Sequence, residues 1–170
     1  MKIILKNGRG QLGQLLKQKT KELDFENQII VYHTWDIDDK SIDSQKKQYE
    51  KFKSFVLDNR DKKIIFISTS SQNETQYARY KQLSECFLIQ NCKDCLVLKF
   101  PTLIGKGIFM DFKNSLKKPY GIMNIMTLEN ACNLVVKNLN YDGLLKIKSF
   151  EGHKIDAKMV YDMVRLWKIF

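Results

Sequence analysis

Tyr77 and Lys81 are the two residues whose types and spacing best fit a chemical role. They are four residues apart, so on a helix they share one face. A free tyrosine has a pKa of about 10, and a neighbouring ammonium lowers it, which makes general acid–base work feasible near neutral pH. Thr69 or Ser70, at the end of the preceding predicted strand, would hold a substrate oxygen. An exposed Tyr/Lys pair is also common on helices, so the spacing alone does not establish catalysis.

A glycine-rich turn near the start of the chain is a second candidate site. It follows a predicted strand, opens a predicted helix, and consists of Gly8, Arg9, Gly10, Gln11, Leu12 and Gly13. In this context, G-x-G-x-x-G lets backbone N–H groups approach a pyrophosphate at the helix N-terminus. Gly13 would bring the helix close to the sheet, and Arg9 could meet a 2′-phosphate. The alternative is a strand-to-helix turn that binds nothing.

Composition limits the classes of function. Hydrophobic residues make up 44% of the 170 residues, which suits one domain with a sizeable core. The net charge of +10 comes from 29 Lys and Arg against 19 Asp and Glu. These basic residues are scattered, so nucleic-acid binding is not expected. No apolar run approaches the roughly 20 residues that cross a bilayer, and the first one is too short for a signal peptide. We therefore expect a cytoplasmic protein without a membrane span.

Cysteine and histidine do not predict a metal site. Cys92 and Cys95 have the spacing of a redox pair or of half a zinc site. No second such pair or histidine cluster matches them, so we interpret them as reduced thiols near the end of a helix and the start of a strand. His33 and His153 are isolated in the sequence, and we expect structural roles for both.

Hydrophobic periodicity predicts alternating strands and helices over the first hundred residues. Short apolar runs predict strands at 2–5, 29–32, 64–67 and 96–98. Helical spacing predicts one helix carrying the leucines 12, 15, 16 and 23, a second with Tyr49, Phe52 and Val56 on one face, and a third from a cap at Asn73 to about Gln90. This alternation indicates a parallel sheet covered by helices.

The pattern changes beyond Pro101. Residues 102–121 read as loop with room for one short helix. A helix capped by Thr127, a last strand over 144–147 and a final helix capped by Asp156 follow. The predicted apolar side of this final helix consists of Met159, Val160, Met163, Val164 and Trp167.

Six segments resemble, in order, the motifs of one family. The segment 77–85 has Tyr-x-x-x-Lys followed by Glu85, the segment 65–69 ends in Ser-Thr, and 98–107 matches Arg-x-Pro-x-x-x-Gly-x-Gly with Lys99 in place of Arg. The other three segments are 7–13, 31–35 and 126–131. The chain thus resembles a shortened extended short-chain dehydrogenase/reductase of the NAD-dependent epimerase/dehydratase type. Gly-Gln-Leu-Gly in the glycine turn is closest to the sugar-nucleotide reductase branch.

The resemblance implies a fold and an activity. The fold would be α/β, a reduced Rossmann-like three-layer arrangement with a mostly parallel sheet of about four to five strands. Residues 1–101 would form the truncated nucleotide-binding region, and 102–170 a small C-terminal substrate-type region packed on it as one compact unit. The implied activity is epimerisation, dehydration or reduction of a nucleotide-activated sugar, with surface-polysaccharide synthesis as the setting.

The resemblance also implies roles for individual residues. Tyr77 would be the general acid/base, Lys81 would lower its pKa, and the hydroxyls of Thr69 and Ser70 would hold the substrate. NAD or NADP would lie against the glycine turn, Lys81 and two residues after the second strand, which are His33 and Thr34.

One part of the family pattern is missing. Only about five residues separate the first helix from Ile29, where the family inserts two more strands and the residue that reads the cofactor ribose. If the first helix keeps its usual face, the crossover becomes left-handed, whereas about 98% of such connections are right-handed. If it changes face, the glycine turn leaves the usual crevice. In both cases the first strand becomes an edge that needs cover, which a homodimer partner would supply.

Two hypotheses follow from this shortening. The first is a working NAD(P)-dependent enzyme that uses Tyr77 and Lys81. The second is a catalytically degenerate relative that binds a sugar nucleotide, or a partner subunit, without turning over the cofactor.

Overall fold

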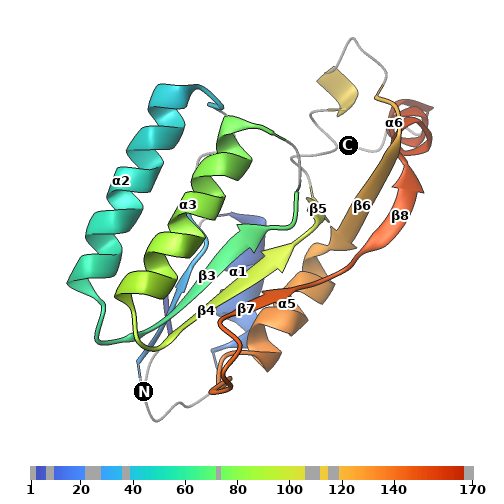
Figure 1. Cartoon of the computed structure of the whole chain (residues 1–170). Coiled ribbons are helices and arrows are strands. Elements are labelled where there is room, and N and C mark those ends of the chain that lie inside the picture. Colours follow the sequence, from blue (N-terminus) through green and yellow to red (C-terminus); the bar gives the residue numbers. More distant parts are fainter. Residues whose placement is uncertain are drawn as a thin grey trace.

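Strands and helices alternate through most of the chain (Figure 1). The structure, a computed structural model, describes residues 3–6, 10–21, 28–35, 39–71, 74–105, 112–114 and 119–166. The strands are β1 (Ile3–Lys6), β2 (Ile29–Tyr32), β3 (Lys63–Thr69), β4 (Cys95–Phe100), β5 (Thr102–Ile104), β6 (Ile122–Thr127), β7 (Ile147–Ser149) and β8 (His153–Asp156). The helices are α1 (Gln11–Lys19), α2 (Ile42–Asp58), α3 (Gln76–Asn91), α5 (Leu128–Lys137) and α6 (Ala157–Leu166).

The main sheet is fully parallel and has the order β1-β2-β3-β4-β7. Its register pairs Lys6 with Tyr32 and Tyr32 with Phe66, so the carboxyl ends of the strands share one edge. β2 is buried along its whole length, as its unbroken apolar run predicts for a strand covered on both faces. The predicted α/β class, the mostly parallel sheet and the three layers are confirmed.

Alternating strand residues point into two separate cores. One core joins α1 and α5 to the sheet through residues that include Leu16, Val31 and Val135. The other joins α2 and α3 to the opposite face through residues that include Phe52, Phe66 and Leu88. The helices therefore form two layers, with α2 and α3 on the near side in Figure 1.

The connection from β1 through α1 to β2 has an unusual hand. From β1 to β4, each crossover steps one strand in the same direction across the sheet. Because α1 lies on the opposite face from α2 and α3, its crossover has the opposite hand to theirs. The crossovers through α2 and α3 are right-handed (Figure 1), so the one through α1 is the uncommon left-handed type. Of the two arrangements considered from the sequence, α1 keeps its face and changes hand.

A smaller sheet, of order β5-β6-β8, forms the C-terminal part. β5 and β6 pair in parallel, and β6 and β8 pair antiparallel. Sequence analysis missed all three strands of this sheet, and β5 lies inside the predicted loop. The predicted last strand at 144–147 overlaps only the first residue of β7, which belongs to the main sheet and is followed by β8. α5 and β7, although they come late in the chain, complete the layers of the main sheet.

Two predicted helix details are wrong. α6 buries Ala157, Tyr161 and Val164, whereas Met159 and Met163 of the predicted apolar face are 51% and 47% exposed. Trp167 lies outside the described residues. The N-cap of α3 is Thr75, whose hydroxyl accepts from the N–H of Ala78 at 3.2 Å, and not Asn73, which also lies outside them.

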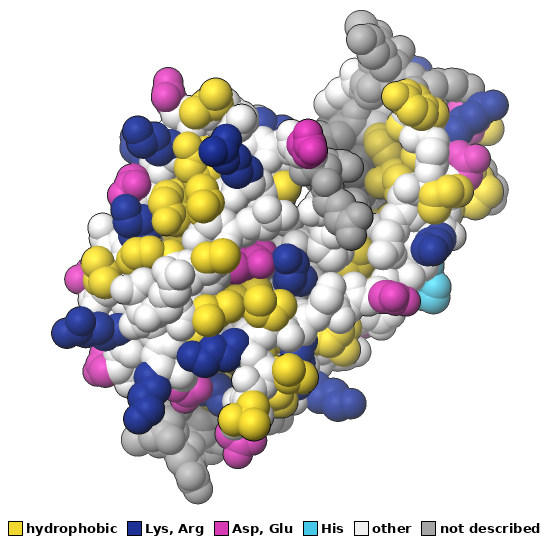
Figure 2. Space-filling model, in the orientation of Figure 1, with side chains coloured by type: hydrophobic (Ala, Val, Ile, Leu, Met, Phe, Trp, Pro, Cys, Tyr) yellow, Lys and Arg dark blue, Asp and Glu magenta, His cyan; other side chains and the backbone are white. Residues whose placement is uncertain are grey.

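The visible surface carries mixed charge. Figure 2 shows lysine and arginine side chains dispersed among acidic and apolar ones over the face that includes α2 and α3. Across the part of the chain that the structure describes, no helix has the length and apolar character needed to cross a membrane.

Thr127 is the predicted N-cap of α5, and its hydroxyl accepts from the N–H of Asn130 at 3.2 Å. Thr127→Ala leaves this N–H without its side-chain acceptor, so we expect the free energy of unfolding to fall by about 1 kcal/mol. Urea titration followed by circular dichroism measures the change. Thr127→Ser keeps the hydroxyl and should stay close to the parent, and equal stability of the alanine and serine variants would contradict the cap.

Candidate functional site

The candidate site lies at the carboxyl edge of the main sheet. β2 leads directly into His33 and Thr34, and β3 ends at Thr69 and continues into Ser70. α1 begins beyond the end of β1, and α3 begins beyond β3. The predicted residues from these four elements therefore meet one edge of the sheet. Gly8 and Arg9 lie outside the described residues.

The start of α1 leaves room beside the glycine turn. Gly10 is the N-cap, with φ −70° and ψ 166°, and as a glycine it makes no side-chain cap hydrogen bond. A Cβ added at Gly10 would meet nothing within 4 Å. Gly13, one turn later, is buried, as expected for a helix that packs closely on its neighbours. Helix N-termini of this kind attract anions through free N–H groups and the helix dipole.

Gly105 brings the turn after β4 against the same helix end. A Cβ at Gly105 would lie 2.7 Å from Oε1 of Gln11 and 2.9 Å from Cδ1 of Leu128. Only glycine allows this approach without displacing those side chains. The motif at 98–107 and the glycine turn, which are far apart in the sequence, thus come together in space.

Lys81 is a buried amine at the centre of the site. Its side chain crosses from α3 to the sheet, where Nζ donates to the carbonyl oxygen of Ile67 at 2.6 Å. Nζ also lies 4.3 Å from the ring centroid of Phe66 and 4.8 Å from that of Trp35. The residue is only 2% exposed, and burial lowers the pKa of its ammonium to about 7, although the nearby Glu85 acts in the opposite direction. Lys81 can therefore exchange a proton near neutral pH.

Glu85 connects α3 to the ends of β3 and β4. The hydroxyl of Ser68 donates to one carboxylate oxygen of Glu85, and Nζ of Lys99 donates to the other at 3.0 Å. Glu85 and Lys99 are part of the family motifs in the sequence, but the sequence analysis did not predict them, or Ser68, as site residues. The available signal was the spacing of Glu85, four residues after Lys81 on the same helical face.

Tyr77 differs from the expectation that a nearby ammonium would lower its pKa. Burial instead raises the pKa of its phenol to about 12. Lys81 directs its Nζ to Ile67, and within the described residues no hydrogen bond joins it to Tyr77. At neutral pH, the Tyr77 phenol is therefore protonated.

His33 and Thr34 follow β2 beside these groups. Nε2 of His33 is buried and has no hydrogen-bond partner among the described residues. Burial lowers the pKa of this histidine, and the positive charges of Lys81 and Lys17 lower it further, so the ring is neutral at pH 7. The Thr34 hydroxyl donates to the carbonyl oxygen of Lys6 at 2.7 Å.

The two predicted hydroxyl residues after β3 are held in different ways. Oγ1 of Thr69 accepts from the N–H of Ser71 at 3.1 Å, which leaves its own proton available to a ligand. The N–H of Ser70 donates to the carbonyl oxygen of Phe100 at 2.8 Å and ties the end of β3 to β4.

The cysteines match their structural interpretation. Cys92 is the C-cap residue of α3 and Cys95 begins β4, and both are buried, free thiols. In the described ranges, no group of three or more histidine, cysteine or acidic residues is placed to hold a metal ion.

Comparison with known proteins identifies the fold. No protein-family model matches the sequence, and no curated protein matches it in a sequence comparison. Among solved structures, a dTDP-4-dehydrorhamnose reductase from Clostridium acetobutylicum is similar with a TM-score of 0.78 at 14% identity, over 99% of this chain and 81% of that chain.

Two further structures carry bound ligands. The Bacillus anthracis dTDP-4-dehydrorhamnose reductase in complex with NADP has a TM-score of 0.70 at 12% identity, over 98% of this chain and 80% of that one. The Bordetella bronchiseptica enzyme WbmG in complex with NAD and UDP also has a TM-score of 0.70, at 11% identity, over 97% and 77%. The chain thus shares the Rossmann-like α/β fold of these enzymes, which is the fold that the sequence motifs predict.

The burial of Lys81 makes stability depend on pH. Its pKa is about 7 in the folded protein and near 10.5 when unfolded, so between these values the unfolded chain binds one more proton. The free energy of unfolding should therefore rise with pH from about 7 towards 10, by at most about 1.4 kcal/mol per pH unit. Lys81→Met should lose this rise, whereas the exposed-residue control Lys47→Met should keep it. Urea unfolding between pH 6 and 9 measures the slopes, and parallel profiles for all three proteins would contradict a buried, neutralised lysine.

Proposed function

We propose that the chain is an NAD(P)-dependent epimerase, dehydratase or reductase that acts on a nucleotide-activated sugar in surface-polysaccharide synthesis. The proposal is supported by the position of the α1 N-terminus, with Gly10 as its N-cap, at the same carboxyl edge of the sheet as the residues Lys81, Thr69 and Tyr77. The same fold occurs in enzymes crystallised with NADP, or with NAD and UDP, which supports these ligand classes here.

The chain's own residues would divide the work as follows. NAD or NADP, when bound, supplies or accepts the hydride. The N–H groups at the start of α1 and the open space at Gly10 suit its pyrophosphate, and His33 and Thr34 line the same edge. Thr69 would hold the substrate oxygen through its free proton. Tyr77, which is protonated at neutral pH, would donate a proton to that oxygen.

Lys81 would then supply a proton to Tyr77 after Tyr77 has donated its own. Because the pKa of its amine is about 7, it exists in both protonation states near neutral pH, and its ammonium form can restore the proton that Tyr77 gives away. Glu85, held by Ser68 and Lys99, would favour this charged form from the next turn of α3.

A second function is favoured by one specific observation. Nζ of Lys81 already donates to Ile67 and lies against the Trp35 and Phe66 rings, an arrangement that also suits a purely structural lysine. Under this alternative the chain is a degenerate relative that binds a sugar nucleotide or a partner subunit without turning over the cofactor.

The proposed setting is a cytoplasmic homodimer. β1 is the edge of the main sheet, and Ile4 in its middle is 36% exposed. An edge strand of this kind needs cover, which a second copy of the chain can supply. Within each copy, residues 1–101 would serve the cofactor and 102–170 the substrate.

Gly10→Ala tests the cofactor site without disturbing the fold. Alanine tolerates the backbone angles of Gly10, and its Cβ meets open space, so stability should be unchanged. If the turn receives a pyrophosphate, the added methyl group should weaken NADH or NADPH binding by about tenfold, which corresponds to about 1.4 kcal/mol. Calorimetric titration of both dinucleotides measures this. No binding of either dinucleotide to the parent protein would remove the enzyme proposal and leave the alternative.

Tyr77→Phe tests catalysis separately from binding. Removal of the phenol oxygen should abolish turnover of dTDP-4-dehydrorhamnose and of other nucleotide-sugar trial substrates, while dinucleotide affinity and the circular dichroism spectrum stay unchanged. Absorbance at the nicotinamide band follows a net reduction, and chromatography of the nucleotide sugar follows epimerisation or dehydration, which return the cofactor to its starting state. If the parent turns a substrate over and Tyr77→Phe does so at the same rate, Tyr77 does not have the proposed role.

A further inference from the structure

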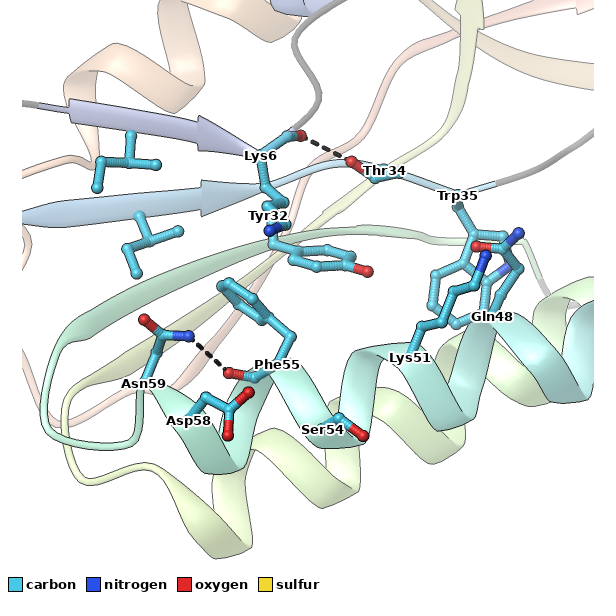
Figure 3. Close-up of a pocket in the computed structure, with 12 residues that line it drawn as sticks. Lys6, Tyr32, Thr34, Trp35, Gln48, Lys51, Ser54, Phe55, Asp58 and Asn59 are labelled. Atoms are coloured by element: carbon cyan, nitrogen blue, oxygen red, sulfur yellow. Dashed lines mark hydrogen bonds between the residues drawn. The ribbon is translucent and has the colours of Figure 1, made fainter.

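A cavity of about 890 Å³ lies between β1, β2 and α2 (Figure 3). It is on the opposite face of the sheet from α1. Its size is within the range of about 300–1,000 Å³ that is typical of small-molecule sites. The lining residues from the strands and the segment after β2 are Ile4, Lys6, Ile30, Tyr32, Thr34 and Trp35. Those from α2 and its end are Gln48, Lys51, Ser54, Phe55, Asp58 and Asn59.

The hydroxyl of Tyr32 points into this cavity without a protein partner. Tyr32 is only 5% exposed, and Figure 3 shows its oxygen directed between the strands and α2. Among the described residues no hydrogen bond reaches this oxygen, and it is not one of the fully buried unpaired atoms, so it is open to the cavity. Burial raises the pKa of this phenol to about 12, so at neutral pH it is available as a donor. A phenol donor that faces a cavity of this size without a protein partner is available to a ligand.

The charges in the cavity are separated along its length. Lys6 ends β1 and Lys51 lies in the middle of α2, and within the described residues neither forms an ion pair. Asp58 is the last residue of α2 and lies towards the amino edge of the sheet, away from Trp35 and Lys51 (Figure 3). It likewise has no ion pair in the described part of the chain. The cavity thus has Lys51 at the end near Trp35, the Lys6 ammonium beside Phe55, and the acceptor Asp58 at the other end (Figure 3).

Aromatic rings form the walls between these ends. The rings of Tyr32 and Phe55 pack with their centroids 4.8 Å apart, and Trp35 lies on the side of Lys51. The Lys6 ammonium lies 5.5 Å from the centroid of the Phe55 ring, so one face of this ring is turned towards the cavity. A flat ring system can lie against these walls by offset or edge-to-face contact.

We propose that this cavity binds a nucleoside phosphate. The phosphate would meet Lys51 and accept a hydrogen bond from Tyr32, because charge-assisted bonds to phosphate are among the strongest polar contacts. The base would lie along the aromatic walls beside the Lys6 ammonium, and the carboxylate of Asp58 would accept hydrogen bonds from hydroxyl or amino groups. The opposite charges at the two ends fix the direction in which such a molecule enters.

The cavity lies on the other face of β1 from α1, although Thr34 borders both this cavity and the proposed cofactor site. It uses neither the glycine turn nor Tyr77. Gly10→Ala and Tyr77→Phe leave the lining of the cavity unchanged. Because UDP also belongs to the ligand class proposed for the catalytic site, Lys51→Met and Tyr32→Phe, which change only the cavity, identify the site that binds it.

Isothermal titration of the full chain with UDP, uridine and inorganic pyrophosphate tests the proposal. We expect UDP to bind, and uridine and pyrophosphate to bind at least about tenfold more weakly, because each supplies only one half of the contacts. Lys51→Met and Tyr32→Phe should each weaken UDP binding by about tenfold. Tyr32→Phe removes a hydroxyl that has no protein partner, so it should fold as well as the parent.

Lys47→Met is the matched control, because Lys47 is an exposed lysine on α2 that does not line the cavity. It should keep the affinity of the parent for UDP. Three results would overturn the proposal: no heat with UDP up to about 1 mM, where binding free energy falls to about 4 kcal/mol; pyrophosphate binding as tightly as UDP; or UDP affinity unchanged in both Lys51→Met and Tyr32→Phe.

Discussion

The direct connection of β1 to β2 through α1 constrains the rest of the molecule. Because α1 lies on the face of α5, the two helices pack together, and Nζ of Lys19 joins them by bonds to the carboxylate of Glu129 and to Oδ1 of Asn133. The other face of β1 then has α2 only along one side, and the cavity lies there. The left-handed crossover, the edge position of β1 and the cavity thus have one common cause.

Polar groups inside the site bind the layers together. Glu85, which is only 5% exposed, connects α3 to Ser68 of β3 and Lys99 of β4, and Lys81 connects α3 to the backbone of β3. A buried charge without partners costs several kcal/mol, so each of these contacts offsets a penalty as well as fixing a position. Apolar packing between α3 and the sheet would not by itself fix the rotation of this helix. These contacts fix the face that it presents at the carboxyl edge.

Much of the fold was predictable because its signals are local. The unbroken apolar run 29–32 marks a strand covered on both faces, and the hydroxyl of Thr127 marks the start of α5. The small sheet was not predictable, because its strands are short and depend on distant contacts. For example, a Cβ at Gly152 would lie 2.1 Å from the carbonyl oxygen of Ile125. In α6, apolar residues occur on two sides, so periodicity alone did not identify the buried one.

The candidate site was likewise predictable only where its signals are local. The common face of Tyr77 and Lys81 follows from their spacing, but their proton affinities depend on burial by residues far away in the chain. Periodicity could not predict how deeply the two side chains are buried. It therefore did not predict that burial lowers the pKa of Lys81 and raises that of Tyr77.

The Trp35 side chain is a wall shared by two regions. One part of it lines the cavity beside β1, its Nε1 is held by Oε1 of Gln45 at 2.7 Å, and its ring lies 4.8 Å from Nζ of Lys81. A ring in this position favours the charged form of the amine. Any occupant of the cavity that turns this ring also changes the proton affinity of Lys81, and by thermodynamic reciprocity protonation of Lys81 changes the affinity for that occupant by the same factor. One indole thus makes occupancy of the cavity and the protonation state of the lysine linked variables.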